Sequence, residues 1–216
     1  MLDALLDALA LVLPVGCAGC GTADRSVCAR CRDALVQPVT TTRLDGIEVR
    51  SALRYDGVAR SLILALKENG RTDAAAALAR ALRPLLPPAY ELATVPASVA
   101  GRRRRGYDPV ALLVRKGGRR SSPVLRLTRA TQSQKSLGAA GRAGNRAGSL
   151  SAIGDLRGRR FAIVDDVVTT GATIAEAARA IRAAGGEAVC AVALAATPRY
   201  FPNSPREDWA ARVTLE

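Results

Sequence analysis

The stretch VDDVVTTGAT, residues 164–173, sets two adjacent carboxylates beside three threonine hydroxyls and a glycine. The apolar residues 161–164 predict a buried strand that leads into it, and apolar residues at helical spacing predict a helix from Ala172 to Ala184. Ligands of an open parallel sheet bind beyond the carboxyl ends of its strands, and the start of a helix offers free N–H groups to an anion. The stretch therefore suits a sugar phosphate. The turn would hold the phosphate, and the carboxylates would accept hydrogen bonds from vicinal hydroxyls or hold Mg²⁺ through water.

Several other chemistries are excluded by the residue types present. The stretch matches neither the GxxxxGK[ST] phosphate loop nor the GxGxxG dinucleotide pattern. The chain contains no histidine, which removes Ser-His-Asp and Cys-His catalysis and the HExxH zinc proteases. Any general acid–base step would fall to Asp, Glu, Lys, Tyr or water.

A second candidate site is the cysteine pattern C-x2-C-x7-C-x2-C, made by Cys17, Cys20, Cys28 and Cys31. Two tight turns that face each other with two thiolates each form a closed, tetrahedral structural zinc site, which is our main interpretation. Two disulfides and an iron–sulfur cluster are the alternatives, and a reducing compartment disfavours the disulfides. The fifth cysteine, Cys190, lies in an apolar run and is predicted to be a core residue.

Basic charge is concentrated in residues 101–160, which hold 16 Lys and Arg against two acids, whereas the whole chain has a net charge of +13. This distribution favours an anionic partner such as phosphate, pyrophosphate or nucleic acid. The alternative is a solvated, arginine-rich loop.

Strand and helix patterns alternate along the rest of the chain. Strands are predicted in IEVRSALRYDG, in ELATVPAS and at 189–194, and helices in VARSLILALKENG and TDAAAALARALRPLL. Asp108 as N-cap and Pro109 at the first helical position predict a helix over 108–116. The arginine run before it is predicted to be a loop. The polar, basic residues 124–153 are interpreted as a mobile lid, a nucleic-acid arm or a disordered segment.

The N-terminal residues MLDALLDALALVLPVG are predicted to form a short amphipathic helix that ends at Pro14. Asp3 and Asp7 stand where a signal peptide needs basic residues, and the apolar run is too short to span a bilayer. We therefore expect a cytoplasmic protein with no membrane span.

The stretch 164–173 resembles the phosphoribosyl pyrophosphate (PRPP) signature of type I phosphoribosyltransferases. The resemblance implies that Asp165 and Asp166 bind the ribose hydroxyls. It also implies that the 5′-phosphate is held by a cradle consisting of Thr169, Thr170, Gly171, Ala172 and Thr173.

The order of motifs along nearly the whole chain resembles the ComF/GntX family of competence-associated, phosphoribosyltransferase-like proteins. These motifs are the four cysteines, YDGVARSLILALKENG, RRRRGYDPVALL, TRATQSQKSLGAAGRAGN and the PRPP signature. The resemblance places Lys67 in the family's lysine-containing helix end. Asp108-Pro109 depart from the family's usual Asn-Gln.

The remaining site residues follow from this resemblance and from the basic charge. The pyrophosphate loop would be Pro96, Ala97 and Ser98, with Arg105 from an Arg-Gly-aromatic motif. Further cations and hood or nucleic-acid residues are expected at Arg102, Arg103, Arg104, Arg129, Gln132, Lys135, Arg142 and Asn145.

The predicted fold class is α/β: a type I phosphoribosyltransferase-like parallel sheet flanked by helices, with a small N-terminal zinc-ribbon-like module. We expect the helix and cysteine module in residues 1–36, the phosphoribosyltransferase-like domain in 45–200 and a tail in 201–216.

The predicted function is Mg-dependent phosphoribosyl transfer, a glycosyltransferase reaction, from PRPP to an unassigned acceptor. The family resemblance links it to DNA uptake and to partners in the competence machinery. The alternative is a non-catalytic accessory protein of transformation that binds single-stranded DNA and retains a PRPP-like site. The basic segment favours it, and the scarcity of aromatic residues for base stacking counts against it. A PRPP-sensing transcription regulator is a weaker reading, since no recognition helix stands out.

Overall fold

The computed structural model describes residues 16–23, 25–128 and 148–198. The predicted N-terminal helix, residues 129–147 and the predicted tail lie outside the described residues. Among the described residues, no helix has the length and apolar character needed to cross a membrane.

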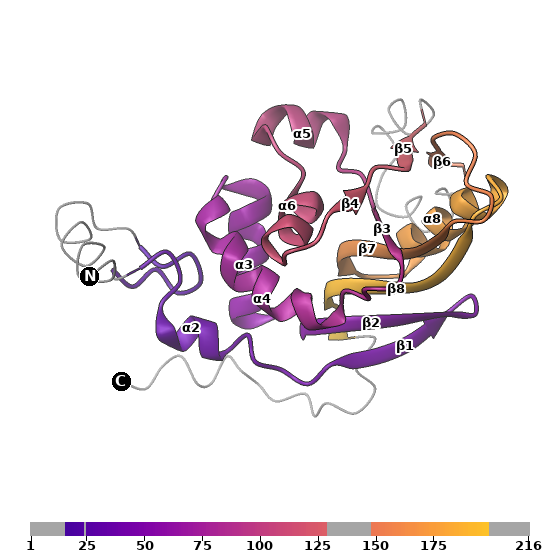
Figure 1. Ribbon diagram of the computed structural model, residues 1–216. Coiled ribbons are helices and arrows are strands. Elements are labelled where there is room, and N and C mark those ends of the chain that lie inside the picture. The colour runs from indigo at the N-terminus through magenta and orange to yellow at the C-terminus, as the bar shows by residue number, and fades with distance from the viewer. Residues whose placement is uncertain (1–15, 24, 129–147, 199–216) are drawn as a thin grey trace.

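A mixed sheet forms the centre of the described structure (Figure 1). Within the described residues it has six strands in the order β1-β2-β8-β7-β3-β4. Strand β1 pairs antiparallel to β2, and all other neighbours are parallel. The strands are β1 (Thr40–Leu44), β2 (Ile47–Arg54), β3 (Glu91–Thr94), β4 (Ser121–Ser122), β7 (Arg160–Val168) and β8 (Glu187–Ala196). A separate antiparallel pair consists of β5 (Leu125–Leu127) and β6 (Leu150–Ala152).

Helical segments connect these strands. They are α2 (Ala29–Asp33), α3 (Gly57–Glu68), η1 (Thr72–Ala74), α4 (Ala75–Leu82), η2 (Arg83–Leu85), α5 (Val99–Arg105), α6 (Pro109–Lys116) and α8 (Ala172–Ala183). The fold class predicted from the sequence, a mainly parallel sheet flanked by helices, is confirmed.

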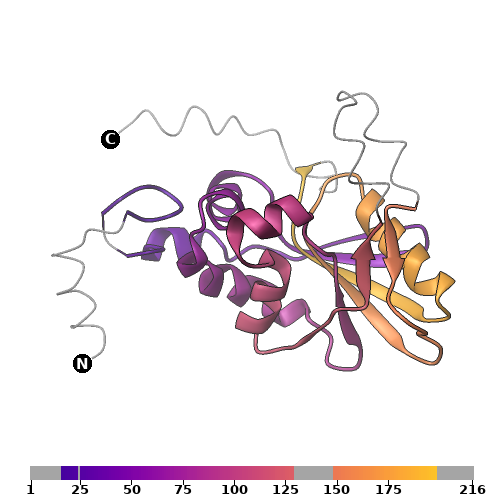
Figure 2. The same cartoon turned by 90° about the horizontal axis from the view of Figure 1, so that it is seen from above.

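The two faces of the sheet are covered by different helices (Figure 2). Buried residues of α3, α4 and α6 form one apolar core with one face, and those of α8 form a second core with the other. In β7 the side chains alternate between these two cores. Phe161 and Ile163 belong to the core with α8, whereas Ala162 and Val164 belong to the core with α3, α4 and α6. Burial on both faces explains the nearly continuous apolar sequence of this strand.

The crossovers that follow β3 and β7 lead toward opposite edges of the sheet. From β3 the chain crosses through α5 and α6 to β4 on one side, whereas from β7 it crosses through α8 to β8 on the other. The two connections therefore diverge at the carboxyl ends of β3 and β7. Such a switch point leaves a crevice at this edge, where ligands of open α/β sheets bind.

Two local predictions need correction. The arginine run 102–105 is the second half of helix α5 rather than a loop, because Ser98 caps the helix start by accepting from the N–H of Gly101. Arginine is also a good helix former. Strand β7 continues to Val168 rather than ending at Val164, because Asp165 and Val167 still pair with β8. Helix α6 is confirmed, with Asp108 as its N-cap.

Glu176 of α8 anchors the short strand β6. Its side chain is 4% exposed. It accepts from the N–H of Leu150 at 3.0 Å and from two nitrogens of Arg179 at 2.7 Å. Arg179 in turn donates to the carbonyl of Leu150 at 2.9 Å. Burial raises the pKa of Glu176, but the Arg179 guanidinium and the Leu150 N–H outweigh it and hold that pKa below its usual range.

We predict that Glu176→Ala lowers the free energy of unfolding by about 2–3 kcal/mol, because it strands a buried N–H. The matched change Glu187→Ala breaks an exposed pair with Arg160 and should cost less than about 1 kcal/mol. Urea unfolding measures both. Because the folded-state pKa of Glu176 is lowered, its contribution is complete above the unfolded pKa of about 4.3 and is lost as the pH falls through the folded value. An equal cost for the two variants at pH 7 would contradict the anchoring role.

Candidate functional site

A cavity of about 790 Å³ opens at the carboxyl edge of the sheet, within the usual range for small-molecule sites. Its walls come from the ends of β3 and β7, the start of α8, the end of α3, and α5. Predicted site residues that line it are Pro96, Ala97, Ser98, Arg104, Arg105, Asp165, Asp166, Thr169 and Thr173. The cavity therefore lies at the switch point and gathers most of the described residues that the sequence singled out.

The two adjacent carboxylates differ in their surroundings. Asp165 is 8% exposed, and its Oδ1 accepts from the backbone N–H of Asp166 at 2.8 Å. Asp166 is more open, with a side chain 16% exposed that pairs with Lys67 at 3.0 Å. Both carboxylates line the cavity although they are neighbours in an extended strand.

The turn after β7 gives the wall its hydroxyls and its helix start. Gly171 has a φ of +77° and precedes α8, and a Cβ there would lie 2.3 Å from Cδ1 of Leu44. Glycine is thus required both for the backbone conformation and for the close approach. The Thr170 hydroxyl accepts weakly from the N–H of Ala172 at 3.4 Å. The lining of the cavity includes Thr169 and Thr173, but not Thr170, Gly171 or Ala172.

The loop Pro96-Ala97-Ser98 is fixed by Asp108. One carboxylate oxygen accepts from the N–H of Ala97 at 2.9 Å, and the other caps α6 through Ala111 at 3.1 Å. Asp108 therefore ties the loop after β3 to the helix that follows α5. This contact explains what an aspartate does at the position where the sequence departs from the ComF/GntX pattern: it has a structural role.

The sequence analysis did not predict that the end of α3 forms a wall of the cavity. Lys67 and Glu68 line the cavity, together with Tyr55, Val95, Leu127, Ser149 and Leu150. The resemblance assigned Lys67 only to a helix end, since nothing in its spacing indicates a partner 99 positions away. The residues on either side of 129–147 also reach the cavity.

The arginines of α5 separate into two groups. Arg104 and Arg105 line the cavity. Arg104 pairs with Glu68, and Arg105 donates to the carbonyl of Lys67 at 2.8 Å. Arg102 and Arg103 are exposed and do not line the cavity. The other predicted hood residues, namely Arg129, Gln132, Lys135, Arg142 and Asn145, lie outside the described residues.

The four cysteines of the N-terminal pattern come together as predicted. Their sulfur atoms all lie within 4.8 Å of one another, and the sulfurs of Cys20 and Cys28 are 3.7 Å apart. Tetrahedral zinc with Zn–S bonds of about 2.3 Å places its sulfurs about 3.8 Å apart, whereas a disulfide needs about 2.05 Å. The four thiols are therefore close enough to hold one zinc ion.

Local donors prepare two of these thiols for a cation. The Thr22 hydroxyl lowers the pKa of Cys20 to about 6. Burial raises the pKa of Cys17, but backbone N–H groups, with that of Cys28 first, outweigh it and lower that pKa. Burial and the neighbouring sulfurs raise the pKa of Cys31. The thiolate is the form that binds metals. Cys190 is only partly buried, and it packs against the core.

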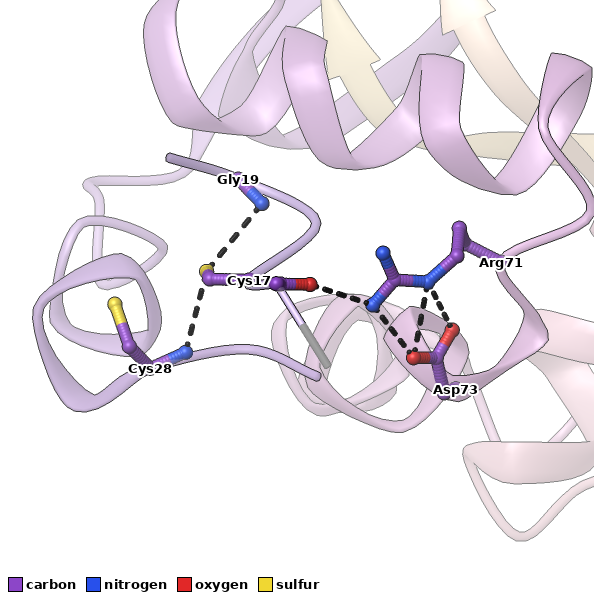
Figure 3. Close-up of polar contacts among 6 residues, drawn as sticks. Cys17, Gly19, Cys28, Arg71 and Asp73 are labelled. Carbon is purple, nitrogen blue, oxygen red and sulfur yellow. Dashed lines mark hydrogen bonds and ion pairs between the residues drawn. The ribbon is translucent and has the colours of Figure 1, made fainter. Parts of the chain in front are cut away.

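The cysteine cluster is tied to the rest of the chain beside the end of α3 (Figure 3). Arg71 donates to the carbonyl of Gly16 at 3.0 Å while Asp73 accepts from its guanidinium at 2.8 Å. Cys17 and Cys31 belong to the same buried core as α3 and α4. Gly19 is needed here because a Cβ would lie 2.8 Å from the sulfur of Cys31.

Comparison with known families finds a similarity over part of the chain. Residues 112–213 match the family model described as the phosphoribosyl transferase domain. This range contains both carboxylates and the threonine-rich turn, but not the loop 96–98 or α5. No curated protein matches the chain. This part of the chain is therefore phosphoribosyltransferase-like, as the PRPP signature predicted.

We predict that the purified protein holds one zinc ion per chain and that Cys31→Ser loses it and melts at a lower temperature, because the cluster shares a core with α3 and α4. Cys190→Ser, which alters the cysteine of β8, should retain the metal. Metal analysis and thermal unfolding measure both. Metal-free protein with an unchanged melting curve would contradict a structural zinc site.

Proposed function

We propose that the protein is a Mg-dependent phosphoribosyltransferase that binds PRPP at the carboxyl edge of its sheet. The observation that carries the proposal is that one cavity is lined at once by two carboxylates, by threonines at a helix start, and by a backbone loop beside arginines. These groups match, in turn, the hydroxyls, the 5′-phosphate and the diphosphate of PRPP. The match of residues 112–213 to the phosphoribosyl transferase domain supports the same substrate.

In this proposal Asp165 and Asp166 accept hydrogen bonds from the two ribose hydroxyls. Asp165 is the more buried, and the Asp166 N–H fixes its position. The turn from Thr169 to Thr173 holds the 5′-phosphate with hydroxyls and with N–H groups at the start of α8, where the helix dipole favours an anion. The ribose ring is thereby held at both ends.

The diphosphate lies toward the loop Pro96–Ser98 and Arg105. During transfer the bond between C1 of the ribose and the diphosphate oxygen breaks, and an acceptor atom bonds to C1. Positive charge develops on the ring while negative charge moves to the leaving group. The Ser98 N–H of the loop and the guanidinium of Arg105 stabilise that negative charge, so no histidine is needed. Magnesium that enters with PRPP neutralises part of the diphosphate charge.

The family resemblance extends this proposal. The cysteine cluster with structural zinc, the arginine-rich α5 and the PRPP signature suit a ComF/GntX protein that acts in the cytoplasm and serves DNA uptake, with competence proteins as partners. The residue order along the chain supports this assignment, and the acceptor stays open.

A second candidate function rests on Arg102 and Arg103. Both are exposed on α5, beside the cavity but outside its lining. Neither forms an ion pair within the part of the chain that the structure describes, and exposed cations of this kind suit the phosphate backbone of single-stranded DNA. This function needs no catalysis and is compatible with a retained PRPP site.

We predict that Asp165→Asn/Asp166→Asn weakens PRPP binding in the presence of Mg²⁺ at least about 100-fold, because two charge-assisted hydrogen-bond acceptors are lost. The control is Asp155→Asn, an exposed acid paired with Arg157, which should bind like wild type. Calorimetric titration measures the affinities. A folded wild-type protein that does not bind PRPP would refute the proposed function.

For the second candidate we predict that Arg102→Ala/Arg103→Ala weakens binding of single-stranded DNA and reduces the slope of log K against log salt by about 1.4, at about 0.7 per phosphate contact. Arg80→Ala/Arg83→Ala removes the same charge from exposed positions on α4 and η2 and should leave the slope unchanged. Fluorescence anisotropy over a salt series measures both. Equal slopes for wild type and the first variant would exclude α5 as a DNA-binding surface.

A further inference from the structure

Lys67 is a cationic residue of the cavity that lies outside the PRPP signature and the proposed pyrophosphate loop. It lies in the last turn of α3, outside the range that matches the family model. Its ammonium lies 3.1 Å from Oδ1 and 3.0 Å from Oδ2 of Asp166. The side chains are 30% and 16% exposed, so the pair is reached from the cavity without being fully hydrated.

Three neighbouring contacts hold the end of α3, the helix that carries this ammonium. The carbonyl of Lys67 accepts from Nη1 of Arg105 at 2.8 Å. The carbonyl of Leu66 accepts from the hydroxyl of Tyr107, whose pKa is raised by burial. The last carbonyls of a helix have no hydrogen-bond partner within the helix. Arg105 and Tyr107 each donate a hydrogen bond to one of these carbonyls. Glu68 completes the set through its pair with Arg104. Three consecutive residues of α3 are thus bound to the segment that carries the arginines.

Two donor groups lie near this junction, and that of Lys67 is partly exposed in the cavity. An ammonium has three N–H donors, and the carboxylate of Asp166, whose oxygens lie 3.0 and 3.1 Å from Nζ, can occupy at most two of them. Arg105, which lines the same cavity, has a buried Nε without a hydrogen-bond partner. A buried donor without a partner is costly unless a ligand or water satisfies it. Both donors belong to residues that are joined directly, by the 2.8 Å bond from Arg105 to the Lys67 carbonyl.

We propose that Lys67 is a further ligand-binding residue of this cavity, which stays paired with Asp166 and donates its remaining N–H to the diphosphate of PRPP beside Arg105. The inference rests on the proposed function and adds a binding residue from the half of the chain that precedes the family match. Lys67 would then join the two ends of the substrate site, because its ammonium contacts a ribose-binding carboxylate and the leaving group together.

The ion pair also explains how an acidic edge can accept a ligand with several negative charges. Without Lys67, the carboxylate of Asp166 would face the diphosphate without a counter-charge, and the two would repel each other. Ribose 5-phosphate carries no diphosphate, so its binding depends on the carboxylates and the turn but not on this neutralisation. The two ligands therefore separate a contact to the diphosphate from a general effect on the site.

The test is calorimetric titration, in excess Mg²⁺, of PRPP, inorganic pyrophosphate and ribose 5-phosphate into wild type, Lys67→Met, Lys67→Arg and Lys116→Met. Lys116 is the matched control, since it is exposed in the last turn of α6. For Lys67→Met we expect PRPP and pyrophosphate to bind about 10- to 100-fold more weakly, and ribose 5-phosphate to change by less than about threefold. Lys67→Arg should restore part of the pyrophosphate affinity, and Lys116→Met should match wild type.

Each other result points to a definite failure. Unchanged pyrophosphate affinity in Lys67→Met, with wild type binding PRPP, overturns the role of Lys67 and leaves the proposed function standing. Equal losses for all three ligands, or a lowered melting temperature without rescue by Lys67→Arg, would show that Lys67 only positions Asp166 or supports the fold. A folded wild type that binds none of the three ligands overturns the proposed function and this inference together.

Discussion

The parallel pairing of β3 with β7 is the constraint on which the rest of the site depends. The register of this pair sets Thr94 beside Val164, so β3 ends at the level where β7 reaches Asp165 and Asp166. Strand β3 continues into the loop 96–98 and β7 into Asp165, Asp166 and the threonine-rich turn. Because the following crossovers run in opposite directions, the connections diverge at this point and the cavity opens there. In both strands the residues just before this level are buried, namely Leu92 and Ala93 in β3 and Phe161 to Val164 in β7.

Charge in the site is arranged mainly through helix ends. The end of α3 is a cluster of carbonyls, and Arg105 and Tyr107 satisfy two of them. The same contacts bring the arginines of α5 to the cavity and set Lys67 against Asp166. The basic segment thus has a structural task as well as an affinity for anions. Arg102 and Arg103 are exposed and take no part in these contacts with α3.

The cysteine cluster is continuous with the main core rather than attached by a contact at its surface alone. Cys17 and Cys31 are buried with residues of α3 and α4, and Arg71 reaches back from the end of α3 to the carbonyl of Gly16. Segment 66–73 therefore carries contacts to the cluster at one end and to the cavity at the other. A metal in the cluster would stabilise the same helix that positions Lys67.

The sequence by itself determined the features that depend on neighbouring residues. The cysteine spacing predicted the cluster, the apolar run before Asp165 predicted β7, and the helical spacing of apolar residues after the TTGAT turn predicted α8. Each of these features lies within one short segment of the chain, where the spacing of residues determines which side chains can meet. The sequence also led to the correct fold class, because a buried strand followed by a helix and a second strand permits few arrangements. What only the tertiary structure decided are the pairings between distant residues. The arginine run was expected to be a loop, but the cap at Ser98 makes it helical. The pairs Lys67 with Asp166 and Asp108 with Ala97 arise because packing brings separate elements to one edge. No periodicity records such contacts, since the type and spacing of a residue in its own segment do not indicate its partner in another.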